Sequence, residues 1–163
     1  FDQRIRAKGE YHFSFEAMKC SDLPAGDSDG KSDPYLMFVW DAPGLEYESK
    51  SLFDKIRTLW LGQSWPRTEY ISKTLDPDWG DEKISLSLKD CQVGPEQMLF
   101  ISAIDYDAVG KDSCLGVLAL SLKELLLMGA YQFEKTVEID EPFLWEGRLA
   151  GRVRCKVIIK RDR

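Results

Sequence analysis

Two short stretches of the chain concentrate carboxylate side chains in a way that could bind a hard cation. Residues 26–35 read Gly-Asp-Ser-Asp-Gly-Lys-Ser-Asp-Pro-Tyr, and residues 104–107 read Ile-Asp-Tyr-Asp. Carboxylates packed this closely repel one another, so each stretch costs folding free energy unless a cation compensates the charge. Ca²⁺ accepts roughly six to eight oxygen ligands in flexible geometry, and it therefore suits both stretches.

The spacing of these acids predicts that they face a common point. Asp27 and Asp33 flank a bend rich in Ser and Gly, which can curl so that both carboxylates face inward. Asp105 and Asp107 are two residues apart, so an extended backbone places both side chains on one side. Pro34 favours an extended conformation at Asp33 and leads into an apolar run. We therefore expect loops between β-strands that present carboxylates to a metal.

Other chemistries that use carboxylates fit the sequence poorly. The segment starting at Asp27 opens like an EF-hand, but its glycine is the fourth residue and its twelfth residue is Phe38, where a Glu is needed. The chain lacks the Asp-Thr-Gly of aspartic proteases and the Walker A motif, and its one histidine is His12. We expect no active site in this chain, although it could be a regulatory part of a larger enzyme.

Length, composition and charge predict one folded domain. The 163 residues are 44% apolar and 31% charged, which excludes a disordered chain. We assign residues 11–160 to a single domain and residues 1–10 to a linker or flexible end. The missing initiator Met suggests an excised domain or a processed chain. The net charge of −6 argues against a nucleic-acid binder, and it would repel an anionic membrane until cations bind.

The cysteines indicate buried thiols rather than a zinc site or disulfides. Cys20, Cys91, Cys114 and Cys155 are widely separated and form no zinc-binding pattern. Cys20 and Cys155 lie in strand-like runs, where we expect them to be buried. Free thiols favour a reducing compartment, which we take to be the cytoplasm.

Apolar periodicity predicts an all-β fold, an eight-stranded antiparallel β-sandwich with its functional loops at one end. The strands are expected at residues 11–18, 35–40, 67–72, 83–88, 98–104, 115–120, 137–139 and 151–159. A short helix near 122–128 follows a capping-box pattern that begins at Ser121.

Residues 41–66 interrupt this strand pattern. Apolar side chains recur at helical spacing near residues 48–62, which predicts a helical insertion that packs on the sandwich. The alternative is that Trp60 and Trp65 insert into a membrane or dock a protein partner.

Three segments of the sequence resemble the C2 domain family, as in protein kinase C and synaptotagmins. Residues 22–35, with Asp-Leu-Pro followed by Gly-Lys-Ser-Asp-Pro-Tyr, resemble the family's first calcium loop. Residues 73–79 are similar to its Lys-Thr-Leu-Asn-Pro-Xaa-Trp turn, with Asp76 replacing Asn, and residues 105–116 resemble its third loop. A strand that closes the chain at 151–159 resembles the circularly permuted form of the family, as in phospholipase C enzymes.

The resemblance implies a set of Ca²⁺ ligands. They are the carboxylates of Asp27, Asp33, Asp105 and Asp107, with the backbone carbonyls of Gly26 and Tyr106 as further oxygens by position. The family's fifth acidic position falls on Ser113, and Asp112 stands one residue earlier. This departure implies one well-bound Ca²⁺ and a second, weaker one.

The resemblance also implies a function, which is Ca²⁺-dependent docking on anionic phospholipid at the periphery of cytoplasmic membranes, as in signalling and vesicle trafficking. Val109 and Lys111 would meet the lipid at the loop tip. Arg67 and Lys73 would form a second basic lipid patch, unless they belong to a solvated strand face. The basic residues at 148–163 alternate along one strand and could face acidic neighbours. The rival function is a Ca²⁺-independent protein-interaction domain that uses residues 41–66.

Overall fold

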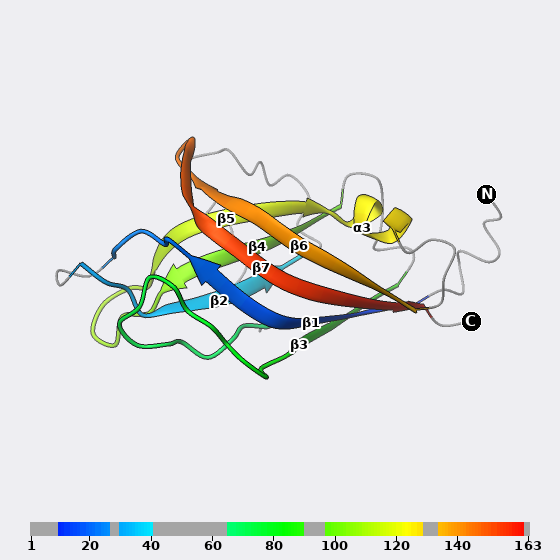
Figure 1. Ribbon diagram of the computed structural model, residues 1–163, viewed down its shortest axis with the longest axis horizontal. Coiled ribbons are helices and arrows are strands. Elements are labelled where there is room, and N and C mark those ends of the chain that lie inside the picture. The colour runs from blue at the N-terminus through cyan, green and yellow to red at the C-terminus, as the bar shows by residue number, and fades with distance from the viewer. Residues whose placement is uncertain (1–9, 27–29, 41–64, 90–96, 129–133, 162–163) are drawn as a thin grey trace.

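The computed structural model of the chain describes residues 10–26, 30–40, 65–89, 97–128 and 134–161. Within these ranges the chain forms antiparallel β-strands and one short helix (Figure 1). In chain order the elements are β1 (Glu10–Ser21), β2 (Pro34–Val39), β3 (Ile84–Lys89), β4 (Met98–Asp105), β5 (Ser113–Ser121), α3 (Leu122–Met128), β6 (Glu134–Trp145) and β7 (Arg148–Arg161). The expected all-β class is confirmed.

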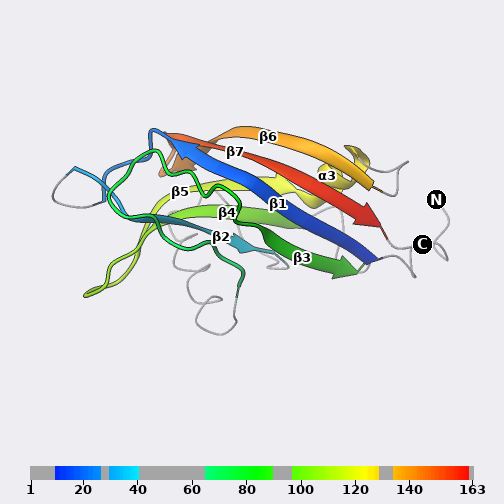
Figure 2. The same cartoon turned by 60° about the horizontal axis from the view of Figure 1, so that its bottom comes forward.

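The strands form two layers that face each other. Their hydrogen-bonded order is β2-β4-β5-β6-β7-β1-β3. β5 and β6 are joined by a single residue pair, Val117 with Leu144, so the ladder divides there into two halves. The rings of Phe15 in β1 and Phe38 in β2 lie 4.8 Å apart, although these strands are not neighbours in the order. The halves therefore pack face to face as a β-sandwich, which Figure 2 shows from a second side.

The order of the strands confirms the permuted topology. β7, the last strand along the chain, lies between β6 and β1 in its sheet. Among the strands of the described ranges, β1 alone precedes the first acidic loop. Both acidic loops lie at the end of the sandwich away from the start of β1 and the end of β7 (Figure 1). The topology thus gathers those candidate ligands that the structure describes at one end of the molecule.

The expected strand at 67–72 is only partly regular. It runs beside β2 and makes one isolated bridge to it. The amide of Thr68 donates to the carbonyl of Leu36, and the amide of Ile71 donates to that of Pro34. Between these two hydrogen bonds the 67–72 segment advances by three residues, whereas β2 advances by two. This difference of one residue interrupts the regular pairing of the two segments. Regular strands are therefore present at seven of the eight expected places.

The first strand contains a β-bulge that the alternating pattern did not predict. Phe13 and Phe15 point into the core, but the next buried residues are Met18 and Cys20, so the alternation shifts by one residue. Ala17 has a positive φ of 50° at this point. The extra residue changes which face of β1 the following side chains occupy.

The short helix is confirmed, whereas most of the insertion lies outside the described residues. α3 begins after Ser121, whose Oγ accepts a hydrogen bond from the amide of Glu124, as in an N-cap. The helical insertion near 48–62, Trp60 included, falls in residues 41–64, outside the described part. Trp65 is only 9% exposed and packs against Trp40, with ring centroids 4.9 Å apart. Trp65 is thus a core residue and does not offer an exposed docking surface.

Apolar side chains are buried on both faces of β2. Leu36 and Phe38 point into the core between the layers, where the expected buried thiols Cys20 and Cys155 also lie. Burial raises the pKa of the Cys155 thiol to about 12, which keeps it protonated at neutral pH. The alternate residues of β2 join a second apolar cluster on the opposite face, made of Tyr35, Met37, Val39, Trp65, Phe100, Ile104 and Val117.

Candidate metal-binding loops

The two acidic loops are joined at their base by hydrogen bonds around Asp33 and Asp105. The amide of Asp33 donates to Oδ1 of Asp105 at 2.8 Å. The amide of Tyr106 donates in return to the backbone carbonyl of Asp33 at 3.0 Å. β2 and β4 pair up to this point, because Pro34 stands opposite Asp105 in their ladder. Asp105 is 3% exposed, so its carboxylate is held inside the loop base.

The segment 73–79 also supports the site through its backbone. The amide of Lys73 donates to Oδ1 of Asp33 at 2.7 Å, and Lys73 has a positive φ of 53°. Farther along, Oδ1 of Asp76 accepts a hydrogen bond from the amide of Asp22 at 2.9 Å. The carboxylate oxygen of Asp76 thus accepts the hydrogen bond that the side-chain amide oxygen of an Asn could accept at this position.

Gly26 lies directly against the Asp105 carboxylate. A Cβ atom on Gly26 would fall 2.2 Å from Oδ2 of Asp105, closer than any real side chain can approach. The amide of Gly26 donates to Oγ of Ser32 at 2.7 Å, and the same hydroxyl donates to the carbonyl of Pro24 at 2.8 Å. Ser32 is fully buried, and its supporting role was not predicted from the sequence. The Gly-Lys-Ser-Asp-Pro-Tyr run was its only signal.

The carboxylate of Asp107 turns back onto its own loop. Its Oδ1 accepts hydrogen bonds from the amides of Val109 at 2.9 Å and Gly110 at 3.0 Å. These two bonds lower the pKa of Asp107 below its usual value, because they stabilise the charged form. Val109 is 98% exposed at the tip of this loop, and Lys111 is exposed beside it.

Both oxygens of Asp112 accept hydrogen bonds from the protein. Oδ1 accepts from the amide of Asp107 at 2.9 Å, and Oδ2 accepts from the hydroxyl of Tyr35 at 2.6 Å. Tyr35 is 3% exposed, and burial followed by its contact with Asp112 raises the pKa of this phenol. Ser113 is exposed at the start of β5, opposite Asp105 in the ladder with β4. Asp112 thus connects the backbone of its own loop to the side chain of Tyr35 in β2.

The described donors match part of a calcium site in their chemistry. Asp33 and Asp105 supply hard carboxylate oxygens at one loop base, where Gly26 avoids the collision that a Cβ would make with Asp105. The carboxylate of Asp107 faces the tip of its own loop. Within the described ranges, however, no three His, Cys, Asp or Glu side chains form a group that could hold a metal ion. Asp27, the remaining carboxylate of the expected ligand set, lies outside those ranges.

The expected basic lipid patch involves two residues near the loops. The guanidinium of Arg67 lies 5.5 Å from the centre of the Tyr35 ring, a cation–π arrangement. The side chain of Lys73 is exposed beside Asp33. The neighbouring outward positions of β2 and β4, such as Met37 and Phe100, are apolar and buried. The described part of this face is therefore mainly apolar, with its positive charge at the edge near the loops.

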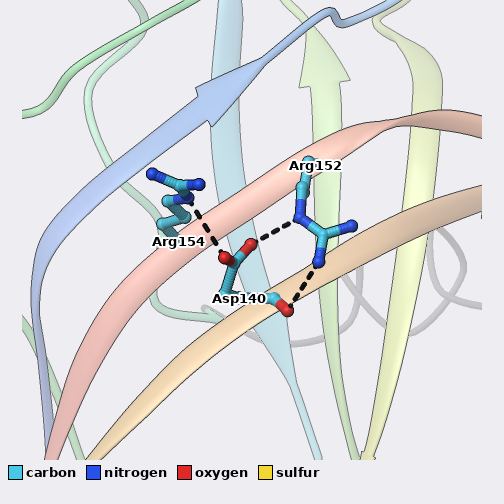
Figure 3. A network of polar contacts seen from close by, with 3 residues as sticks. All are labelled: Asp140, Arg152 and Arg154. Atoms are coloured by element: carbon cyan, nitrogen blue, oxygen red, sulfur yellow. Dashed lines mark hydrogen bonds and ion pairs between the residues drawn. The ribbon is translucent and has the colours of Figure 1, made fainter.

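The basic residues of β7 face acidic residues of β6. Arg152 and Arg154 both contact the carboxylate of Asp140, with Nε–O distances of 2.5 Å and 3.3 Å (Figure 3). Arg152 also donates to the backbone carbonyl of Asp140 at 3.1 Å. The hydrogen bond from Arg152 is the main cause that lowers the pKa of Asp140. At the far end of the strands, Lys160 lies 3.9 Å from Glu134. This face thus carries charges of both signs.

Comparisons with known proteins agree with the topology. A family model described as C2 domain matches residues 12–137. A search of the curated proteins found no match. Among solved structures, the first C2 domain (domain A) of plant Extended Synaptotagmin 1 has a TM-score of 0.66 at 18% identity, over 97% of this chain and 98% of that one.

Two longer structures contain a similar domain. A structure of Extended-Synaptotagmin 2 with its SMP domain and two C2 domains has a TM-score of 0.64 at 16% identity, over 97% of this chain and 30% of that chain. Human GIVD cytosolic phospholipase A2 has a TM-score of 0.61 at 15% identity, over 95% of this chain and 16% of that chain. At these identities the likeness concerns the fold alone, and the chain corresponds to a minor part of both proteins.

Proposed function

Because the chain belongs to the C2 domain family, we propose that it is a peripheral membrane-binding module that docks on anionic phospholipid when Ca²⁺ occupies its acidic loops. The observation that carries this proposal is the contact of Asp33 with Asp105, which brings carboxylates from two loops to one end of the sandwich. Hard carboxylate oxygens suit Ca²⁺ better than a transition metal.

The residues proposed to hold the ion are those implied by the motif. They are the carboxylates of Asp27, Asp33, Asp105 and Asp107, with the carbonyls of Gly26 and Tyr106 as further donors. When bound, Ca²⁺ supplies positive charge and open coordination positions for a lipid phosphate. We propose one firmly bound ion and a weaker second one, because the fifth acidic position is the neutral Ser113.

The proposed contact with lipid is shallow and electrostatic. Val109 at the loop tip has a small apolar side chain, and Lys111 next to it is positively charged. Without cations the net charge of −6 opposes docking on an anionic surface. Arg67 and Lys73 would add attraction for lipid phosphates near the loops. We therefore expect binding that weakens as the salt concentration rises.

The proposed place of action is the surface of a membrane in the cytoplasm. None of the helices in the described ranges is long and apolar enough to cross a membrane. We propose a regulatory or targeting role with no catalysis by this domain itself. The activity of the phospholipase that shares the fold is not carried over to this chain.

The alternative, a Ca²⁺-independent protein-interaction domain, depends on residues 41–66. Trp65, the tryptophan of this insertion that the structure describes, is 9% exposed and therefore gives this alternative no support. A protein that binds its partner equally well with and without Ca²⁺ would favour it.

Thermal unfolding with increasing Ca²⁺ tests the proposed function first. A ligand that binds only the folded state stabilises it by about 2.7 kcal/mol at a hundredfold excess over its dissociation constant. We expect the melting temperature to rise by several degrees with Ca²⁺ and not with Mg²⁺, and the vesicle-bound fraction to rise in parallel. Asp105→Asn should abolish both effects. Glu134→Gln removes the same charge at the far end of the sandwich and should preserve them. A flat response up to millimolar Ca²⁺ would contradict the proposal.

A further inference from the structure

The geometry points to Tyr35 and Asp112 as a positioning pair that holds loop 105–112 in its ion-binding shape before any ion arrives. This inference deepens the proposed function and rests on it for the role of the loop. It assigns to Asp112 a supporting role in place of a ligand's role, and it gives the buried hydroxyl of Tyr35 a function.

Tyr35 is a rigid anchor for this pair. It lies in β2, 3% exposed, and stands opposite Ile104 in the ladder that leads into the loop. Its hydroxyl donates to Oδ2 of Asp112 at 2.6 Å, the short distance of a hydrogen bond to a charged carboxylate. The ring also contacts Arg67, whose guanidinium lies 5.5 Å from the ring centre.

Asp112 connects Tyr35 to the residues at the tip of the loop. Its other oxygen, Oδ1, accepts a hydrogen bond from the amide of Asp107 at 2.9 Å, which connects the two ends of the loop. The carboxylate of Asp107 in turn accepts hydrogen bonds from the amides of Val109 and Gly110. A continuous set of hydrogen bonds thus runs from a buried strand to the exposed tip. A loop that is shaped in advance loses less conformational entropy on binding.

The two possible roles of Asp112 predict opposite effects of removing the Tyr35 hydroxyl. If Asp112 were a ligand that left Tyr35 in order to reach the ion, the buried hydroxyl would lose this acceptor, which opposes ion binding. Tyr35→Phe would then tighten Ca²⁺ binding. If Asp112 positions the loop, as we infer, the same substitution loosens the loop and weakens Ca²⁺ binding.

Amide hydrogen exchange of the metal-free protein tests the inference without any ion. We expect the amide of Asp107 to exchange at least about tenfold faster in Tyr35→Phe and in Asp112→Ala, because each variant breaks the connection to β2. The amide of Ile101, in the middle of β4, should be unchanged if the variants are folded. Tyr70→Phe is the matched control, since Tyr70 packs on Tyr106 beside the same loop with ring centres 4.2 Å apart.

Calorimetric titration with Ca²⁺ gives the second readout. We expect Tyr35→Phe to weaken binding by about threefold to tenfold, with Tyr70→Phe near the wild type. Unchanged exchange at Asp107, or tighter Ca²⁺ binding by Tyr35→Phe, would overturn the inference. A wild-type protein that binds no Ca²⁺ would instead overturn the proposed function, and the exchange experiment would still decide whether Tyr35 and Asp112 shape the loop.

Discussion

The amide of Asp33 donates a 2.8 Å hydrogen bond to the carboxylate of Asp105, and this contact joins two loops that are separated by 72 positions in the sequence. The acceptor is buried, so the bond is shielded from competing water. Asp105 therefore has a structural role in addition to its proposed role as a ligand, and the two roles can be separated by substitution.

Substitutions of Asp105 should distinguish loss of the hydrogen bond from loss of the charge. Asp105→Ala leaves the amide of Asp33 without this acceptor, and we expect a loss of about 1–3 kcal/mol in the free energy of unfolding without Ca²⁺. Asp105→Asn keeps a carbonyl oxygen and should lose clearly less. Urea denaturation measures both values, and equal losses would contradict the structural role.

Gly26→Ala should disturb the loop base, because its Cβ would collide with Oδ2 of Asp105. We expect a loss of about 1–3 kcal/mol in stability, the usual cost of forcing extra atoms into a packed site. In an Asp105→Ala background the colliding oxygen is absent, so the cost of Gly26→Ala should fall. A double-mutant cycle measures this coupling, and additive effects would show that the two residues do not interact.

Lys73→Gly should stabilise the fold while it removes a side chain proposed to face lipid. The positive φ of Lys73 costs a non-glycine residue roughly 1–2 kcal/mol, of which glycine recovers a part. We expect a small rise in melting temperature together with weaker binding to anionic vesicles. Lys73→Ala, which keeps the strain, should lose vesicle binding without gaining stability. Unchanged vesicle binding in both variants would remove Lys73 from the lipid contact.

The pH dependence of the loop follows from the lowered pKa of Asp107. The folded-state pKa lies below the unfolded value, so the carboxylate contributes stability above the unfolded pKa and loses it as pH falls through the folded one. Nuclear magnetic resonance titration should place the Asp107 midpoint below that of an ordinary Asp, which is about 3.9. The amide signals of Val109 and Gly110 should shift with the same midpoint. If the amide signals of Val109 and Gly110 did not shift as Asp107 titrates, this result would contradict their hydrogen bonds to its carboxylate.

Asp140→Asn should increase binding to anionic vesicles in the absence of Ca²⁺. The substitution removes the negative charge that Arg152 and Arg154 share, so both guanidinium groups become available to lipid phosphates (Figure 3). The added binding should disappear in high salt, because exposed charges are screened. Vesicle sedimentation measures it, with Glu134→Gln as a control for the change in net charge. Equal binding by both variants would show that net charge alone matters.

Most strands could be predicted from apolar alternation, but their full extent could not. β6 runs from Glu134 to Trp145, whereas the pattern predicted only residues 137–139, because its outward residues are charged and Pro142 normally signals a break. The bulge at Ala17 was missed for a related reason. Alternation before and after it is regular, and only the tertiary pairing shows the shift of register.

The candidate site was predictable where acids stand in a known motif. Asp33, Asp105 and Asp107 were named from spacing and resemblance, and the structure places Asp33 and Asp105 in contact. The supports of the site were not predictable in the same way. Tyr35 and Ser32 belong to the Gly-Lys-Ser-Asp-Pro-Tyr run, but the run does not show which distant groups their hydroxyls contact. Their roles depend on which distant groups they meet in the fold.

The position of β7 has a consequence for the order in which the protein is synthesised. This strand lies between β6 and β1, and it pairs Tyr11 with Arg161 near the two ends of the chain. A ribosome therefore exposes β1, with the aromatic side chains of Phe13 and Phe15, long before its central neighbour exists. Such distant pairing slows folding, because a large loop must close first. We expect the sandwich to form only after β7 has left the ribosome, and a chain that stops before β7 to be prone to aggregation.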